Sequence, residues 1–342
     1  MRRRQALLGT AAVLLLAYVA FSGAGHVPND TGPIPNDPGR VLNNRGQVLN
    51  RDRTGPPAVN WPHSGQAAFV AGDDRPSASP YQQPAPIASL AKVMTAYLTL
   101  ERYPLSGEQE GFTITVTAAD AEAAAGEASR NQSIVAVRAG EQLTERQLLQ
   151  ALLIPSGNNI ASVLAATVAG SEARFLAEMN AEAHALGMNH TIYTDPSGYD
   201  PRTISTAADQ LRVFQRAMRF PVFRQIVSMD SVTLPVAGTL TNFNPLVARG
   251  YAGKTGSDSA AGGCLAFFTH VNVGGHRLTA AGVVMGAGER QRHIGDPRRR
   301  RRGRRAAGRP RRLGEPYEHG DCVWRAWWPM STPRDEEGEP PP

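Results

Sequence analysis

Apolar residues recur with two different periods along this chain, and the periods divide it into helical and extended regions. Between residues 144 and 219, apolar side chains return every third or fourth residue, which is the spacing of amphipathic helices. This spacing predicts four helices: Thr144–Leu153, Asn159–Val168, Ser171–Leu186 and Thr206–Arg219. A further helix is expected to begin near Ser89, at the start of another apolar run.

Short β-rich runs lie on both sides of this helical region. They predict the strands Gln66–Ala71, Phe112–Val116, Cys264–Val273 and His276–Met285. The Gly-Gly pair between the last two runs is a hairpin signal. Strands from both ends with helices inserted between them predict one mixed α/β domain with an antiparallel sheet. It would span residues 61–288, which is long enough to bury a core of its own.

The N-terminal segment has the composition of an export signal. Three arginines precede an apolar stretch from Ala6 to Ala24, which is the order of charge and hydrophobicity in such signals. Because this stretch is near the shortest length that spans a bilayer, residues 1–25 are either a cleaved signal peptide or a membrane anchor. Both alternatives place the domain outside the cytoplasm. Residues 26–60 are rich in Pro, Asn and Gly and are expected to form a linker.

The C-terminal segment carries most of the net positive charge. The chain has a net charge of +6, and residues 287–342 contain 14 arginines and nine acidic residues. A basic segment can bind anionic polymers, membranes or nucleic acids, but the export signal argues against nucleic acid. Residues 289–342 are dominated by Arg and Pro and are expected to be disordered. We interpret them as the product of a reading frame that changed after about Ala287, because GC-rich coding read out of frame yields Arg, Pro and Gly.

Lysine is far rarer than arginine in this chain. Of the 36 basic residues, only Lys92 and Lys254 are lysines. An amine can lose its proton while a guanidinium stays charged, so a position that remains lysine here is a candidate base. Lys92 follows Ser89 by three residues, which places both side chains on one face of the predicted helix. The pair is either a nucleophile with its base or an ordinary helix start with a capping serine.

Two more motifs follow in order, Ser156-Gly157-Asn158 and Lys254-Thr255-Gly256. Alone, each could be a turn or a chance tripeptide. Together, Ser-x-x-Lys, Ser-x-Asn and Lys-Thr-Gly form the motif set of active-site-serine penicillin-binding proteins and β-lactamases. From about Trp61 to Gly288 the chain resembles the low-molecular-mass D-alanyl-D-alanine carboxypeptidases, the DacA-like S11 serine peptidases. The segments that carry this resemblance are PIASLAKVMTAYLTLE, LLIPSGNN, FLAEMNAEAHALGM, DPSGYDP and KTGSDSAAGGCLAF.

The resemblance implies the fold of β-lactamases and DD-peptidases and assigns roles to the motifs. Ser89 would form an acyl-enzyme with Lys92 as its base, and Ser156 would relay a proton to the leaving amine. The substrate would be a peptidoglycan stem peptide ending in D-Ala-D-Ala, and β-lactams would be covalent inhibitors. The residues implied to bind substrate are Asn158, Lys254, Thr255 and Gly256. The residues implied to form the oxyanion hole with their backbone N–H groups are Ser89 and Ser257.

Two rival functions remain open. A β-lactamase shares the acylation chemistry, but class A enzymes hydrolyse the acyl-enzyme with a glutamate, and residues 190–201 contain none. We therefore expect penicillin to stay attached to Ser89. The other rival is a non-catalytic peptidoglycan-binding relative. Gly253 would favour it, because the family has an apolar residue there and glycine would loosen the strand.

No cofactor or metal is expected. The two cysteines, Cys264 and Cys322, and the eight histidines lack the spacing of a metal site. Cys264 is expected to be a small buried strand residue. The turn expected at Asp195-Pro196-Ser197-Gly198 lies near the active site in the family.

The two lysines should respond differently to arginine. Arginine at position 92 keeps the charge but cannot accept a proton, so Lys92→Arg should abolish acylation of Ser89. At position 254 the need is for positive charge, so Lys254→Arg should retain measurable acylation. The measurement is the rate of labelling by a fluorescent penicillin. Labelling of Lys92→Arg at the parent rate would show that Lys92 is not the base.

Overall fold

The computed structural model describes residues 41–42, 48–49, 59–273 and 275–287. The expected signal or anchor and the C-terminal tail therefore lie outside the described residues, as does nearly all of the expected linker. The described helices are η1 Ala88–Leu90, α2 Ala91–Arg102, α3 Ala118–Ser129, α4 Glu145–Leu153, α5 Asn158–Ala169, α6 Glu172–Ala185, α7 Ala207–Ala217, α8 Pro221–Val227 and η2 Val247–Arg249.

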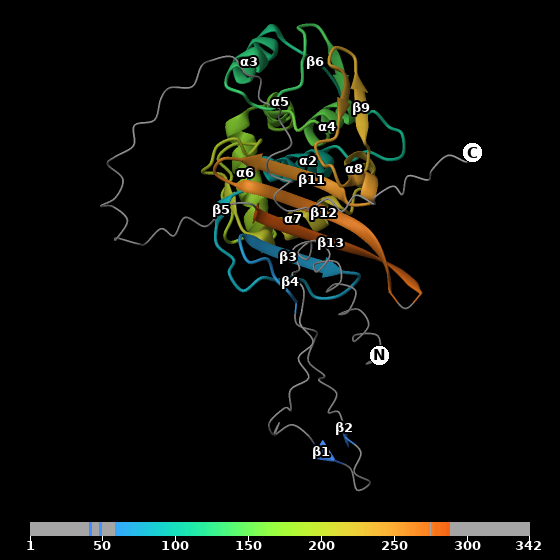
Figure 1. Ribbon diagram of the computed structural model, residues 1–342. Helices are drawn as coiled ribbons and strands as arrows, with labels where there is room; N and C mark the ends of the chain where they lie inside the picture. The colour runs from blue at the N-terminus through green and yellow to red at the C-terminus, as the bar shows by residue number, and fades with distance from the viewer. Residues whose placement is uncertain (1–40, 43–47, 50–58, 274, 288–342) are drawn as a thin grey trace, which may run out of the picture.

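The largest sheet in the described part of the chain has five strands in the order β11-β12-β13-β3-β4, with antiparallel pairing throughout (Figure 1). Its strands are β3 Gln66–Ala71, β4 Ser77–Ala78, β11 Ala252–Asp258, β12 Gly262–Val273 and β13 His276–Ala287. Because β3 and β4 precede the helices while β11 to β13 follow them, the predicted mixed α/β fold with a helical insertion is confirmed. Short two-strand pairs join β1 Val41–Leu42 to β2 Val48–Leu49, β5 Ala85–Pro86 to β8 Ile204–Ser205, β6 Thr113–Thr115 to β7 Gln142–Thr144, and β9 Ser231–Leu234 to β10 Gly238–Thr241.

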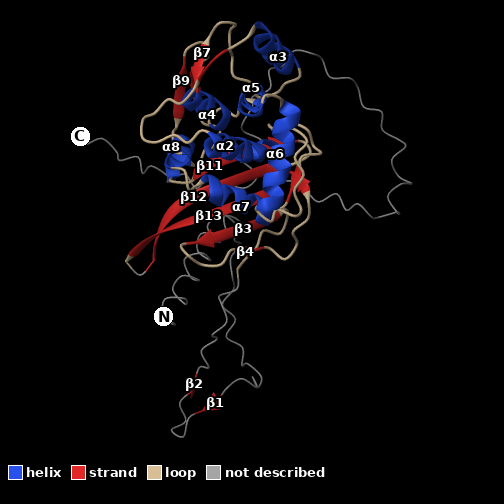
Figure 2. Cartoon of the chain, turned by 180° about the vertical axis from the view of Figure 1, so that it is seen from behind, coloured by secondary structure: helices blue, strands red, loops and turns tan. Residues whose placement is uncertain are grey.

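Helix α2 lies at the centre of the helical layer. Helix α7 packs against β3 and β13, and α2 packs against α4, α5, α6 and α7 (Figure 2). Nine of the 12 residues of α2 are buried. A helix that is buried on nearly all sides is a core helix, and polar groups on it are withheld from water. Lys92 belongs to the first turn of this helix.

The longer predicted elements are present at nearly the predicted bounds. β3 has the predicted ends, and Thr144, Ser171 and Thr206 cap α4, α6 and α7 with their side chains. The hairpin of β12 and β13 is confirmed by the pairing of Val273 with His276. The helix expected near Ser89 starts as a 3₁₀ turn, because Ser89 lies in η1 and α2 begins two residues later.

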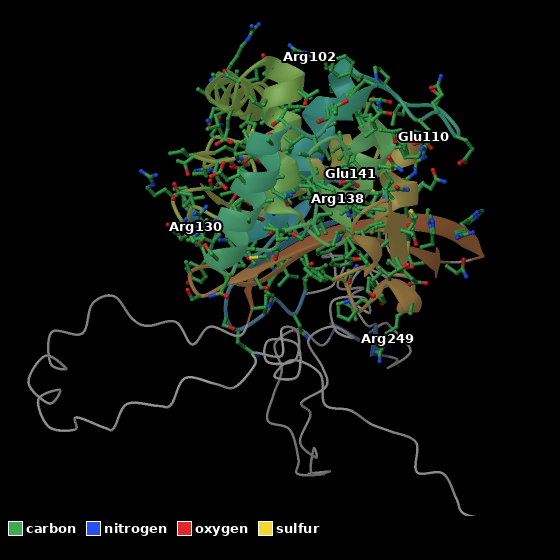
Figure 3. The ribbon with its side chains drawn as sticks, turned by 90° about the horizontal axis from the view of Figure 1, so that it is seen from above. Arg102, Glu110, Arg130, Arg138, Glu141 and Arg249 are labelled. Carbon is green, nitrogen blue, oxygen red and sulfur yellow. The ribbon has the colours of Figure 1, made fainter. Side chains whose placement is uncertain are left out.

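Two regions were not predicted. Helix α3 is alanine-rich and buries only Ala124, so it has no apolar period, although Thr117 and Asp120 form a capping box at its start. The β9–β10 hairpin is short. The carboxylate of Glu141 connects this hairpin to the loop before β7. It accepts hydrogen bonds from the backbone N–H groups of Val236, in the hairpin, and of Arg138. Arg138 and Glu141 lie close together in Figure 3.

The expectation that Gly253 loosens its strand is wrong. β11 pairs with β12 in unbroken register from Ala252 to Asp258, with Gly253 opposite Phe267. A Cβ atom at Gly253 would lie 2.0 Å from the carbonyl oxygen of Ala266. With this backbone, only glycine fits between the two strands, so it allows close pairing here.

Two other glycines allow backbone segments to pack against η1. A Cβ at Gly198 would lie 1.8 Å from the carbonyl oxygen of Ala88. A Cβ at Gly256 would lie 3.0 Å from both the carbonyl oxygen of Ile87 and the backbone nitrogen of Ser89. The turn at 195–198 and strand β11 are thereby brought to the two sides of Ser89.

Gly198→Ala should disturb this packing more than a matched control does. Gly170 is the control because it also has a φ of +80°, but a Cβ added there would meet no atom within 4 Å, so both variants share only the penalty of left-handed backbone. We expect Gly170→Ala to lower the free energy of unfolding by about 1 kcal/mol and Gly198→Ala to lower it by several. Urea unfolding of both variants measures this. Equal losses would show that the contact of Gly198 with Ala88 is unimportant.

Candidate active site

Ser89 and Lys92 lie together at the junction of η1 and α2. The Nζ of Lys92 is 2.9 Å from the Oγ of Ser89. Ser89 is half-buried, whereas Lys92 is 0% exposed. Ala88, just before the serine, has a φ of +45°, which is unusual for a residue other than glycine. Gly198, in the 195–198 turn, packs against the carbonyl oxygen of this alanine, as described above.

The amine of Lys92 has three hydrogen-bond partners, and they differ in what they can do. The side-chain oxygen of Asn158 at 2.6 Å and the carbonyl oxygen of Ser197 at 3.0 Å can only accept hydrogen bonds. The third, the hydroxyl of Ser89, can also donate. A neutral amine has two N–H groups and one lone pair. When both N–H groups donate to the two carbonyl oxygens, the lone pair is directed at the hydroxyl of Ser89.

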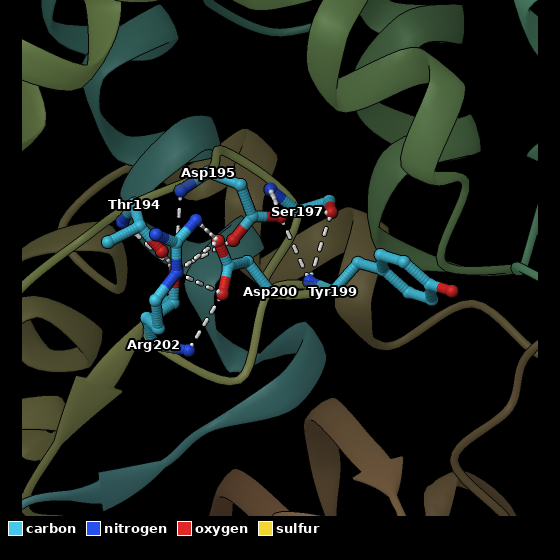
Figure 4. A network of polar contacts seen from close by, with 7 residues as sticks. Thr194, Asp195, Ser197, Tyr199, Asp200 and Arg202 are labelled. Carbon is cyan, nitrogen blue, oxygen red and sulfur yellow. Dashed lines mark hydrogen bonds and ion pairs between the residues drawn. The ribbon is translucent and has the colours of Figure 1, made fainter.

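The carbonyl of Ser197 is presented by a tightly bonded turn (Figure 4). The carboxylate of Asp195 accepts hydrogen bonds from the hydroxyl of Ser197 at 2.6 Å, the backbone N–H of Tyr199 at 2.9 Å and the hydroxyl of Thr203 at 2.7 Å. The hydroxyl of Thr95, on α2, donates to the carbonyl of Pro196 at 2.7 Å. The turn expected at 195–198 is therefore present, and it supplies a backbone acceptor to Lys92. The motifs identified in the sequence did not include this acceptor.

The other two motifs meet through a hydrogen bond between Lys254 and Ser156. Lys254, on β11, is 0% exposed, and its Nζ donates to the hydroxyl of Ser156 and to the carbonyl of Thr255, at 2.9 and 2.8 Å. Ser156 lies between α4 and α5 with a φ of +64°. Gly256 approaches the backbone of Ser89, as described above, and the exposed Ser257 follows it on the same strand. The seven specified residues of the three motifs thus come from η1, α2, the α4–α5 junction, α5 and β11.

Asn158 connects the site to a residue that the sequence did not single out. Asn158 is the first residue of α5, and its side-chain nitrogen donates to the side-chain oxygen of Gln132 at 2.8 Å. Gln132 follows α3 in a loop that no motif marks. Glu127, in the last turn of α3, has one side-chain oxygen that is buried without a hydrogen-bond partner among the described residues. No signal in the sequence points to either residue.

Burial sets the protonation of both lysines. Removal from water lowers the pKa of Lys92 to about 7, although the negative charges of Asp195 and Glu127 act to raise it. Burial, with the nearby charge of Lys92, lowers the pKa of Lys254 well below its usual value. The pKa of Glu127 is raised by burial, while Arg130 and Lys92 act to lower it. Near neutral pH, Lys92 can therefore hold or release a proton with little change in free energy.

Metal-ligand clusters and long apolar helices are both missing from the described ranges. Within these ranges, no group of three or more His, Cys, Asp or Glu side chains is arranged to hold a metal ion. In the same part of the chain, no single helix is long and apolar enough to cross a membrane. Helices α5 and α6 reach the required length and composition only as a pair bent by 86°.

Acylation of Ser89 should rise with pH around a midpoint near 7. Below this pH the amine of Lys92 carries a proton and has no lone pair for the serine, and above it the amine is neutral. A solvent-exposed lysine would give a midpoint near 10.4 instead. The measurement is the rate of penicillin labelling between about pH 5 and pH 9.5. A rate still climbing steeply above pH 9 would contradict the role of burial.

Comparison with known proteins identifies the family. The model of the D-alanyl-D-alanine carboxypeptidase family, peptidase S11, matches residues 78–289. A D-alanyl-D-alanine endopeptidase of Pseudomonas aeruginosa is 31% identical over 228 residues, which cover 64% of this chain and 68% of the relative. The D-alanyl-D-alanine carboxypeptidase DacB2 of Mycobacterium tuberculosis is 35% identical over 185 residues, covering 52% of this chain and 59% of the relative.

Solved structures agree with this result. The Streptomyces K15 DD-transpeptidase matches with a TM-score of 0.58 and 25% identity, covering 67% of this chain and 92% of that chain. An evolved putative penicillin-binding protein homolog from M. tuberculosis matches with a TM-score of 0.55 and 31% identity, covering 67% of this chain and 86% of that chain. The family match takes in more than half of the sequence, including all three motifs. This chain therefore belongs to the D-alanyl-D-alanine carboxypeptidase family of peptidases, S11.

Proposed function

We propose that this chain is a serine D-Ala-D-Ala carboxypeptidase that removes the terminal D-Ala from peptidoglycan stem peptides. The observation that supports the mechanism most directly is the set of partners around Lys92. Two carbonyl oxygens occupy the N–H groups of the neutral amine, which leaves its lone pair for the hydroxyl of Ser89. A serine whose proton is accepted in this way becomes a nucleophile.

Acylation would proceed as follows. Ser89 Oγ attacks the carbonyl carbon of the penultimate D-Ala while its proton passes to Lys92. The backbone N–H groups of Ser89 and Ser257 stabilise the negative charge that develops on the carbonyl oxygen. Ser156 relays this proton from Lys92 to the amine nitrogen of the departing D-Ala as the peptide C–N bond breaks. Water then hydrolyses the ester on Ser89, which releases the shortened peptide and restores the serine hydroxyl.

Substrate binding would use the same walls of the site. Lys254 and Thr255 would hold the terminal carboxylate, and Gly256 gives this strand its close approach to Ser89. Asn158 would contact the peptide backbone of the substrate. This substrate and the export signal together imply action outside the cytoplasm, with attachment to the membrane through residues 1–25 if they are not cleaved. The catalytic part would be residues 61–288.

The carboxylates in residues 190–201 argue against rapid hydrolysis of penicillin, the activity of a β-lactamase. Its two carboxylates are already engaged. Asp195 holds the turn, and Asp200 forms a hydrogen-bonded ion pair with Arg202 at 2.5 Å. The hydrogen bonds from Arg202 lower the pKa of Asp200 to about 2, which makes this carboxylate a weak base. The penicilloyl group on Ser89 should therefore be long-lived.

The test is release of D-Ala from a peptide ending in D-Ala-D-Ala. The full chain should release D-Ala and be labelled covalently by penicillin, and Ser89→Ala should do neither, because it lacks the nucleophile. A cross-linked peptide assayed in parallel separates carboxypeptidase from endopeptidase activity. Cleavage of only the cross-linked peptide would assign endopeptidase function. Labelling without cleavage of either peptide would indicate a non-catalytic binding protein, and rapid penicillin turnover would indicate a β-lactamase.

A further inference from the structure

The loop after α3 reaches the active site through Gln132. The side-chain oxygen of Gln132 accepts a hydrogen bond of 2.8 Å from the side-chain nitrogen of Asn158. The side-chain oxygen of the same Asn158 accepts the hydrogen bond of 2.6 Å from Lys92. The amide of Asn158 therefore connects the loop to Lys92. Its nitrogen faces Gln132 and its oxygen faces Lys92.

The position of Gln132 is fixed by its backbone and by its neighbours. Its N–H donates to the carbonyl of Glu127, at the end of α3. The next residue, Ser133, accepts the backbone N–H of Asn158 at 2.7 Å. Asn159 then binds both backbone groups of Val135, at 3.0 and 2.9 Å. The loop is thus attached to the first turn of α5 by bonds that do not involve the Gln132 side chain, so its backbone should survive substitution of that side chain.

From this geometry we propose that Gln132 is a positioning residue that sets the orientation of the Asn158 amide. The inference rests on the proposed function, in which neutral Lys92 removes the proton of Ser89. An asparagine amide has two orientations of similar shape, with its oxygen and its NH₂ group exchanged. In the observed orientation the NH₂ group of Asn158 donates to the side-chain oxygen of Gln132 while its oxygen accepts from Lys92. Turning the Asn158 amide alone would place two oxygens against each other and would lose both bonds.

The reversed orientation would interfere with the base. The NH₂ group of Asn158 would then face Lys92 and donate to its lone pair, in competition with the hydroxyl of Ser89. The reversed amide would also disfavour protonated Lys92, because the NH₂ group of Asn158 and the ammonium group are both hydrogen-bond donors and would face each other. The charged groups that act on the pKa of Lys92 are Asp195 and Glu127, and Lys92 in turn acts on the pKa of Lys254. Substitution of Gln132 removes none of these groups.

Two substitutions and a control test this proposal. Gln132→Leu keeps the size of the side chain and removes the acceptor. Gln132→Glu keeps an acceptor for the NH₂ group of Asn158 and adds a negative charge. Ser129→Ala is the control, because this exposed serine lies close to Gln132 in the sequence and its hydroxyl donates to the carbonyl of Gly126 within α3. For each full-length protein, the rate of penicillin labelling is measured from about pH 5 to pH 9.5, together with urea unfolding.

The two variants should move the midpoint pH of penicillin labelling in opposite directions. Gln132→Leu should lower the plateau rate of labelling at high pH about tenfold, which is the rate effect expected from the loss of one hydrogen bond. It should also move the midpoint to lower pH. Gln132→Glu should keep the plateau near that of the parent and move the midpoint to higher pH, because the added charge favours protonated Lys92. Ser129→Ala should match the parent in both quantities.

The outcomes separate the inference from the proposed function. If the parent is not labelled at Ser89, the proposed function itself fails. If the parent is labelled and Gln132→Leu has the same plateau and midpoint, Gln132 positions nothing. If both variants lose labelling and unfold at lower urea with an unchanged midpoint, the role of Gln132 is structural, which also overturns the inference.

Discussion

The removal of a lysine amine from water is the constraint on which the rest of this structure depends. Lys92 lies in the first turn of a helix that is buried on nearly all sides, and an ammonium group there has lost its hydration. Burial by itself would only make the group neutral. The structure adds two carbonyl oxygens, from Asn158 and Ser197, that use the N–H groups of the neutral amine. Desolvation and these two partners together leave the lone pair of the amine directed at the hydroxyl of Ser89, which is what the proposed mechanism requires of a base.

The surroundings of Lys92 come from segments that are far apart in the sequence, and backbone contacts hold them in place. The left-handed residue Ala88 and the glycines at 198 and 256 let a turn and a strand approach η1 from two sides. A Cβ atom at either glycine would lie too close to the backbone of residues 87–89, at 1.8 Å for Gly198 and 3.0 Å for Gly256, so the segments would have to move apart. The chemistry therefore depends on residues without side-chain function as much as on the motif residues.

The sequence was informative where a residue type is itself the signal. The rarity of lysine pointed to Lys92 and Lys254, and the apolar periods predicted the main helices and the long strands. The carbonyl of Ser197 could not be predicted, because every residue has a carbonyl and only the folded turn aims this one. Gln132 and α3 were missed for a related reason, since a loop amide and an alanine-rich helix carry no pattern. The prediction for Gly253 was wrong because its effect depends on the distance to β12, which spacing along the chain does not reveal.

The burial of Lys92 also makes folding of this domain a proton-releasing reaction. In the unfolded chain this lysine has its ordinary pKa near 10.4, whereas in the folded domain the pKa is about 7. Between these two values the unfolded chain binds more protons than the folded one, so the contribution of Lys92 to stability rises with pH across this window. Lys254, whose pKa is lowered as well, acts in the same direction. Lowering the pH from about 10 to about 7 therefore has two effects on this molecule: it reduces the contribution of Lys92 to stability, and it begins to protonate the amine beside Ser89.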